Sequence, residues 1–147
     1  MSSLYGQFNH SVDSKGRLAV PFKFRDILGS SLVIVVDPDG SLRIYSAEQF
    51  DNFIADLEEK IDTSSPRGRK LLKTFTANAS SCELDSQGRI IIPPALRKYA
   101  NITKEVVVIG AGTKAEVWDK DRYEERFGDT TEESLSDLVS EFGIKIG

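Results

Sequence analysis

The chain has 147 residues, a formal net charge of −4 and 39% hydrophobic residues, which suits one compact unit or two small intertwined ones. Its one cysteine, Cys82, excludes an intramolecular disulfide, and with one histidine, His10, no zinc-binding set of ligands is recognisable. No apolar run is long enough for a membrane-spanning helix, and no basic-then-apolar leader is present, so we expect a soluble cytosolic protein without a membrane partner.

The first predicted element is a strand within residues 1–12, where Leu4, Phe8 and Val12 alternate weakly with polar neighbours. His10 falls in this strand, and nothing in the sequence pairs with it to make a site. We therefore expect a surface or strand-face histidine and no catalytic role.

A nine-residue motif follows this strand and occurs twice, at an offset of 72 residues. Residues 13–21 read Asp-Ser-Lys-Gly-Arg-Leu-Ala-Val-Pro, and residues 85–93 read Asp-Ser-Gln-Gly-Arg-Ile-Ile-Ile-Pro. Each copy predicts a turn in which glycine takes a positive φ, then a short buried strand, then a helix that begins at proline. Each aspartate can accept hydrogen bonds from the turn amides and from the arginine four residues later. Four residues are assigned to this turn structure: Asp13, Gly16, Asp85 and Gly88.

The duplication continues beyond the motif. In each half a short helix, a strand, a hairpin turn and a second strand follow, ending at Tyr45 and at Trp118. The offset grows to 73 residues by Trp118, so we expect one additional residue between helix and strand in the second half. Two copies are too few for a solenoid, whereas two half-barrels that close on each other around a pseudo-twofold axis leave no exposed strand edges. We therefore predict a mainly β protein with helices, of the α+β class.

The first copy contains the densest basic cluster in either half. Lys15, Arg17, Lys23 and Arg25 lie within eleven positions, opposed by two aspartates. The cluster is equally compatible with a solvated surface and with a phosphate-contacting surface. The negative net charge does not exclude phosphate contact, because ten acids and four bases lie from Ala115 onward and the preceding residues contain 15 bases and 13 acids.

Two helices are predicted between the copies. Residues 47–61, capped by Ser46, place Phe53 and Leu57 on one face, which either covers the core or packs against a neighbouring subunit. Residues 66–75 contain several bases, which we expect to lie opposite the acids of the preceding helix in an antiparallel hairpin, within one protomer or between two.

A short helix at 121–127 and a last amphipathic helix capped by Thr131 are predicted after Trp118. The acidic last helix is either a solvated face or a segment that docks on a neighbouring subunit. The predicted organisation has four parts: a first repeat at 7–48, a helical connection at 49–78, a second repeat at 79–122 and a C-terminal helical tail at 123–147.

The sequence resembles the MraZ family over roughly residues 5–125. The resemblance is carried by the paired Asp-x-x-x-Arg turns, the Gly-Arg-apolar-x-apolar-Pro runs and the closing Glu116-Val117-Trp118. It implies two AbrB/SpoVT-type swapped-hairpin repeats in one chain, which form a pseudo-twofold β-barrel of double-psi type.

The same resemblance implies a function. A member of this family is expected to be a sequence-specific transcriptional regulator of the cytoplasm and nucleoid, acting on the promoter of the division and cell-wall gene cluster. Such a protein is expected to bind short direct repeats in double-stranded DNA as a ring-shaped homo-oligomer. From the residues themselves we expect no cofactor and no metal.

Carried over by motif, the candidate DNA-binding residues are Lys15, Arg17, Lys23, Arg25, Arg89 and Arg97. Arg17 and Arg89 could instead serve only to stabilise their turns. Because Gln87 occupies the place of Lys15 in the second copy, we expect the first turn to contribute more to DNA binding than the second.

Two other classes of function compete with DNA binding. No phosphate-binding loop with a lysine and no nucleophile elbow is present, and a carboxylate paired with arginine is a poor general acid, so we expect no enzyme. The remaining alternative is a ring-forming protein-interaction scaffold without direct DNA readout.

Overall fold

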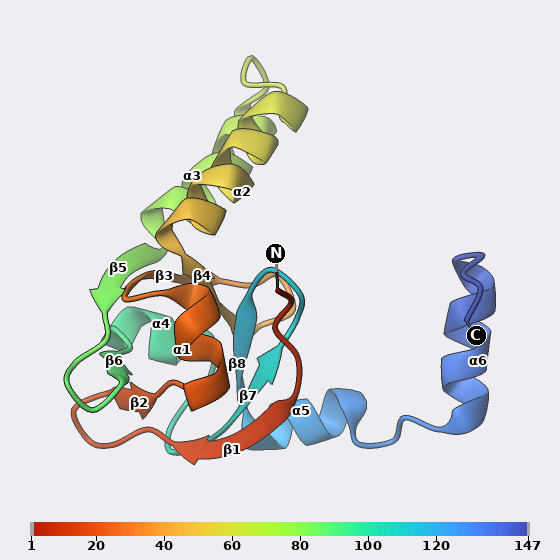
Figure 1. Ribbon diagram of the computed structural model, residues 1–147. Coiled ribbons are helices and arrows are strands. Elements are labelled where there is room, and N and C mark those ends of the chain that lie inside the picture. Colours follow the sequence, from red (N-terminus) through yellow and green to blue (C-terminus); the bar gives the residue numbers. More distant parts are fainter. Residues whose placement is uncertain (1, 147) are drawn as a thin grey trace.

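The computed structural model describes residues 2–146 (Figure 1). Met1 and Gly147, at the ends of the predicted first strand and tail, lie outside the described residues. The elements in chain order are β1 (Gln7–Ser11), β2 (Arg17–Ala19), α1 (Phe22–Leu28), β3 (Ser31–Val36), β4 (Leu42–Ser46), α2 (Ala47–Lys60), α3 (Pro66–Ala77), β5 (Ala79–Glu83), β6 (Arg89–Ile91), α4 (Pro94–Tyr99), β7 (Glu105–Gly110), β8 (Ala115–Asp119), α5 (Lys120–Phe127) and α6 (Glu132–Glu141).

Both repeats contribute three strands to one six-stranded antiparallel sheet, in the order β1-β7-β8-β4-β3-β5, and a separate antiparallel ribbon pairs β2 with β6. Each entry strand crosses to the other repeat, because β1 pairs with β7 and β5 pairs with β3. The register places Arg43 opposite Glu116 and Leu18 opposite Ile90, and both pairs join equivalent positions of the two repeats. A pseudo-twofold axis therefore passes through both pairs, and the predicted α+β, pseudo-twofold architecture is confirmed.

One hydrophobic core joins the sheet to the ribbon. Leu18 and Ile90 of the ribbon are 0% and 1% exposed, and they belong to the same buried cluster as Ile34 and Val106 of the sheet. Both repeats supply residues to this cluster, so the core depends on both halves of the chain.

The spacing between the repeats differs from the expected single insertion. β3 and β7 begin at Ser31 and Glu105, which is two residues more than the motif offset, and the hairpin turn of the second half is then one residue shorter. The added residues lie in the loop after α4, where Asn101 takes a φ of 56° and Ile102 is buried. The offset of 73 residues at β8 therefore combines the motif offset of 72 residues with the two-residue gain before β7 and the one-residue loss in the hairpin turn.

The hairpin turn between β3 and β4 is bound to elements of the second half. Its buried Asp37 accepts a hydrogen bond from Arg43 Nε. The Tyr99 hydroxyl donates to the Asp37 carbonyl at 2.6 Å, and Arg122 donates to the Gly40 carbonyl at 2.7 Å. α4 and α5 are therefore fastened to the first repeat by direct hydrogen bonds.

The helices α2 and α3 form a hairpin that projects from the barrel (Figure 1). The Ser46 hydroxyl accepts from the Gln49 N–H at 3.1 Å, which confirms the predicted cap. Phe53 of α2 stacks on Tyr45 and meets Phe75 of α3 edge to face. The expected pairing of α3 bases with α2 acids within one protomer is wrong: among residues 2–146, no salt bridge joins α2 to α3, because the bases of α3 lie on its exposed side. Pairing between two protomers stays a prediction.

The two C-terminal helices differ in how they are packed. Tyr123 and Phe127 of α5 contact the ring of Trp118, which is 1% exposed. The side chain of Thr131 caps α6, as predicted, yet α6 stands apart from the barrel (Figure 1). Within residues 2–146, no helix has both the length and the apolar character that crossing a bilayer requires.

We predict that Leu18→Ala lowers the free energy of unfolding by about 2–5 kcal/mol, because it opens a cavity between the ribbon and the sheet. Ile91→Ala on the same ribbon is the matched control: Ile91 is 59% exposed, and we expect a change within about 0.5 kcal/mol. Urea unfolding followed by Trp118 fluorescence measures both. Equal losses would contradict the assignment of the ribbon's inner face to the core.

Candidate nucleic-acid interface

The first turn is built by the carboxylate of Asp13. Its Oδ1 accepts from the backbone N–H groups of Lys15 at 3.0 Å and Arg17 at 2.8 Å, and its Oδ2 accepts from Arg17 Nε at 2.6 Å. Gly16 donates its N–H to the Asp13 carbonyl and takes a φ of 82°. A single side chain thus ties both sides of the turn together.

The second turn repeats this hydrogen-bond pattern. Asp85 accepts from the backbone N–H groups of Gln87 at 2.8 Å and Arg89 at 2.9 Å, and from Arg89 Nε at 2.9 Å. Gly88 takes a φ of 73°. In both turns the backbone N–H of the arginine is the largest cause that lowers the pKa of the aspartate, and the arginine side chain lowers it further. These carboxylates are suited to turn structure and not to proton transfer.

Each turn is also covered by an arginine of the other repeat. Arg25 Nε donates to the Val20 carbonyl at 2.9 Å, and its guanidinium lies so close to Gly88 that a Cβ there would be 2.1 Å from Arg25 Cζ. The pseudo-symmetric Arg97 lies over Gly16 in the same way. Sequence reasoning missed this exchange between repeats. The available signal was the recurrence of an arginine four residues past each proline.

Both turns project from the same side of the barrel, at the two ends of the β2–β6 ribbon (Figure 1). Strand alternation buries Leu18 and Ile90 and leaves Arg17 and Arg89 on the outer face as diagonal neighbours. Their side chains are 33% and 28% exposed. The salt bridge uses Nε in each case, and the terminal nitrogens make no hydrogen bond within the described chain. The geometry therefore leaves each arginine able to bind a ligand while it stabilises its turn.

The remaining predicted contact residues lie in different surroundings. Lys15 is exposed at the tip of the first turn, where the second turn has the exposed Gln87. Lys23 is exposed on α1 and lines a pocket with Tyr5 and Phe22, away from the ribbon's outer face. The structure therefore groups the turn and strand residues and separates Lys23 from them.

Burial affects the titration of Cys82 and of His10. Burial raises the pKa of the Cys82 thiol to about 11, which keeps it protonated and weakly nucleophilic at neutral pH. Burial lowers the pKa of His10, and the charge of Arg25 lowers it further. Nowhere in residues 2–146 do three His, Cys, Asp or Glu side chains gather closely enough to bind a metal ion.

We predict that Gly88→Ala destabilises the protein more than Gly112→Ala. Both glycines have positive φ, so each substitution costs about 1 kcal/mol in backbone strain, but a Cβ at Gly112 meets nothing within 4 Å. At Gly88 it displaces the Arg25 guanidinium, which adds about 1 kcal/mol for the broken hydrogen bond. In an Arg25→Ala background the two substitutions should cost the same in urea unfolding. A difference that persists there would contradict the contact.

We also predict a stabilising contribution from the two turns that is lost in acid. Because the folded-state pKa of Asp13 and Asp85 is lowered, this stability is present above about pH 4 and disappears as the pH falls through the folded values. The variant with Asp13→Asn and Asp85→Asn should be less stable at pH 7 and should lose less stability below pH 4, as measured by urea unfolding. Asp129→Asn is the control. If the free energy of unfolding depends on pH in the same way in the wild type, the double variant and the control, the prediction is refuted.

Known proteins resemble the chain along nearly its whole length. It matches the family model described as "MraZ protein, putative antitoxin-like" in two segments, residues 4–72 and 75–141. A "Transcriptional regulator MraZ" of Lachnoclostridium phytofermentans is 41% identical over 139 residues, covering 95% of this chain and 96% of the relative. Proteins of the same name from Acetivibrio thermocellus and Caldanaerobacter subterraneus are 39% and 38% identical, covering 95% and 96% of this chain and 99% of each relative. The resemblance found in the sequence is confirmed, and the chain belongs to the MraZ family.

Proposed function

We propose that the chain is a sequence-specific DNA-binding transcriptional regulator, and that the outer face of the β2–β6 ribbon is its DNA-contacting surface. The observation that carries the proposal is the placement of Arg17 and Arg89 as diagonal neighbours on this face, beside turns that present Lys15 and Gln87. The terminal nitrogens of both arginines make no hydrogen bond within residues 2–146. The family relatives are named as transcriptional regulators, which supports the same class of function.

The ribbon has the shape and chemistry that this role requires. A two-stranded ribbon enters the major groove of B-DNA, where a guanidinium binds guanine or phosphate. Ile91 is 59% exposed on this face, opposite Arg17 in the register. An exposed apolar side chain there suits contact with a thymine methyl group. Arg17, Arg89 and Ile91 are therefore assigned to base recognition, and Lys15 to phosphate.

The structural arginines have a secondary role in this assignment. Arg25 and Arg97 each donate Nε to a backbone carbonyl and cover a glycine of the opposite turn. They act chiefly by fixing the shape of the turns, and Lys23, which lies apart from this surface, adds positive charge at a distance. Changes at these three positions should weaken binding less selectively than changes at Arg17.

One protomer presents one ribbon, so a set of direct repeats in DNA requires several protomers. The proposed assembly is a homo-oligomeric ring that places ribbons at regular spacing along the promoter of the division and cell-wall gene cluster. Each further contact is then intramolecular, which raises the overall affinity far above that of one ribbon. The protein acts in the cytoplasm at the nucleoid and has no catalytic activity.

We predict that Lys15→Glu weakens binding to DNA from upstream of the protein's own gene more than Gln87→Glu does, because only Lys15 contributes a cation. Fluorescence anisotropy over a range of salt concentrations measures the effect. The log–log salt dependence should fall by about 1 for each lysine–phosphate pair that the substitution removes. Equal losses of DNA affinity at the two positions would show that the two turns contribute equally to binding.

The same DNA with its repeats scrambled is the control for sequence specificity. Binding of the wild-type protein should be tighter to the intact repeats and should weaken steeply with salt. Equal affinity for both DNAs, or an affinity that does not change with salt concentration, would refute the proposed function and favour a protein-interaction scaffold.

A further inference from the structure

The helix α6 has an apolar face that its own protomer does not cover. Leu135, Leu138 and Phe142 are 53%, 52% and 71% exposed, and α6 stands apart from the barrel (Figure 1). At 100° per residue these side chains form one stripe, with Glu132 and Glu141 along its two edges. An amphipathic helix in this state is an unoccupied interaction surface.

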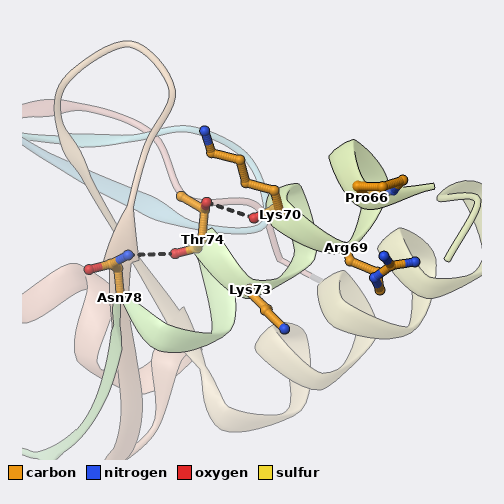
Figure 2. Close-up of a pocket in the computed structure, with 6 residues that line it drawn as sticks. All are labelled: Pro66, Arg69, Lys70, Lys73, Thr74 and Asn78. Carbon is orange, nitrogen blue, oxygen red and sulfur yellow. Dashed lines mark hydrogen bonds between the residues drawn. The ribbon is translucent and has the colours of Figure 1, made fainter. Parts of the chain in front are cut away.

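The helix α3 has the opposite character. It contains four bases and no acid: Arg67, Arg69, Lys70 and Lys73. None of them forms a salt bridge within residues 2–146. Figure 2 shows Arg69, Lys70 and Lys73 extending from the exposed side of α3, where they line a shallow, open hollow of about 420 Å³ with Pro66, Thr74 and Asn78. All six residues belong to α3 or its C-cap, so this α3 groove is the surface between side chains on one helix. The aliphatic stems of the lysines and Pro66 supply apolar surface in this groove.

The groove suits a short acidic helix better than a nucleic acid. The neighbouring α2 exposes acids along its length, among them Asp51, Asp56 and Glu58, and a phosphate backbone that continued past α3 would meet them. A helix of ten residues is about 15 Å long and α3 is about 18 Å long, so α6 matches the basic edge without reaching beyond it.

The geometry of one protomer keeps its own α6 from this groove. α6 is joined to α5 by residues 128–131, which span about 14 Å at full extension. α5 packs on β7 and β8, at the end of the barrel away from the α2–α3 hairpin (Figure 1). The short linker and the position of α5 therefore favour an α6 from another molecule in this groove.

We propose that α6 of one protomer docks in the α3 groove of a second copy of this chain, with its apolar stripe against the lysine stems and Glu132 and Glu141 paired with the bases. The two surfaces differ, so the contact is head-to-tail and generates a ring when the rotation closes. The inference rests on the self-association that is part of the proposed function, and it names the surfaces responsible.

Charge reversal tests the contact, with molar mass measured by light scattering after size exclusion. The variant with Lys70→Glu and Lys73→Glu, and the variant with Glu132→Lys and Glu141→Lys, should each fall to the mass of a protomer, because like charges then face each other. An equimolar mixture of the two variants should recover the wild-type mass, since every contact is again between opposite charges. The matched control is Glu133→Lys with Asp137→Lys, on the face of α6 opposite the stripe, which should assemble as wild type does.

Several outcomes would overturn the proposal. They are an unchanged mass in both variants, a mixture that stays at protomer mass while both variants show a native circular dichroism spectrum, and a loss of DNA affinity in the lysine variant without a change in mass. The last outcome would make the groove a nucleic-acid surface. The docking and the proposed function can fail separately. If the wild-type protein assembles and binds direct repeats, and the variants assemble unchanged, the docking is refuted and the proposed function is left intact. Protomeric variants that still bind a single repeat would support both.

Discussion

The antiparallel pairing of β2 with β6 is the interaction on which the rest of the structure depends. It continues past the strands, because the Val20 N–H donates to the Gly88 carbonyl at 3.0 Å and the Ile92 N–H donates to the Gly16 carbonyl at 2.8 Å. Each turn is therefore bonded to the chain of the other repeat. The pairing buries one side of the ribbon in the shared core and brings both turns to one side of the molecule.

A rigid position for the outward-facing arginines follows from this arrangement. Asp13 fixes Arg17 through its backbone N–H and through Nε, so little side-chain entropy remains to be lost when a ligand binds the terminal nitrogens. A contact residue on a strand, supported by a hydrogen bond from its own turn, is also more precisely placed than one on a mobile loop. The aspartate–arginine pair thus connects the stability of the fold to the proposed recognition surface.

Local chemistry made much of this structure predictable from the sequence. The turns around Asp13 and Asp85, the caps at Ser46 and Thr131 and the duplicated order of elements all depend on residues a few positions apart. Contacts between distant segments were not predictable in this way, and the placement of Arg25 over Gly88 depends on how the repeats interlock. A two-residue insertion before β7 and a one-residue deletion in the next turn likewise appear as one added residue in a count of offsets, and they become visible only from the strand register. The α3 bases do not pair with the α2 acids of the same protomer, because Phe53 and Phe75 make the contact between the helices and the bases of α3 face outward.

The segregation of charge along the chain connects these separate features. A net charge of −4 disfavours approach to DNA, and the acids of the tail contribute most of it. An acidic α6 that moved freely near the ribbon would compete with phosphate for Lys15 and Arg17. In the proposed docking, those acids are neutralised by the bases of a neighbouring α3 and are kept away from the ribbon. Assembly would then strengthen DNA binding in two ways, by multiplying the ribbons and by removing the charge that opposes them.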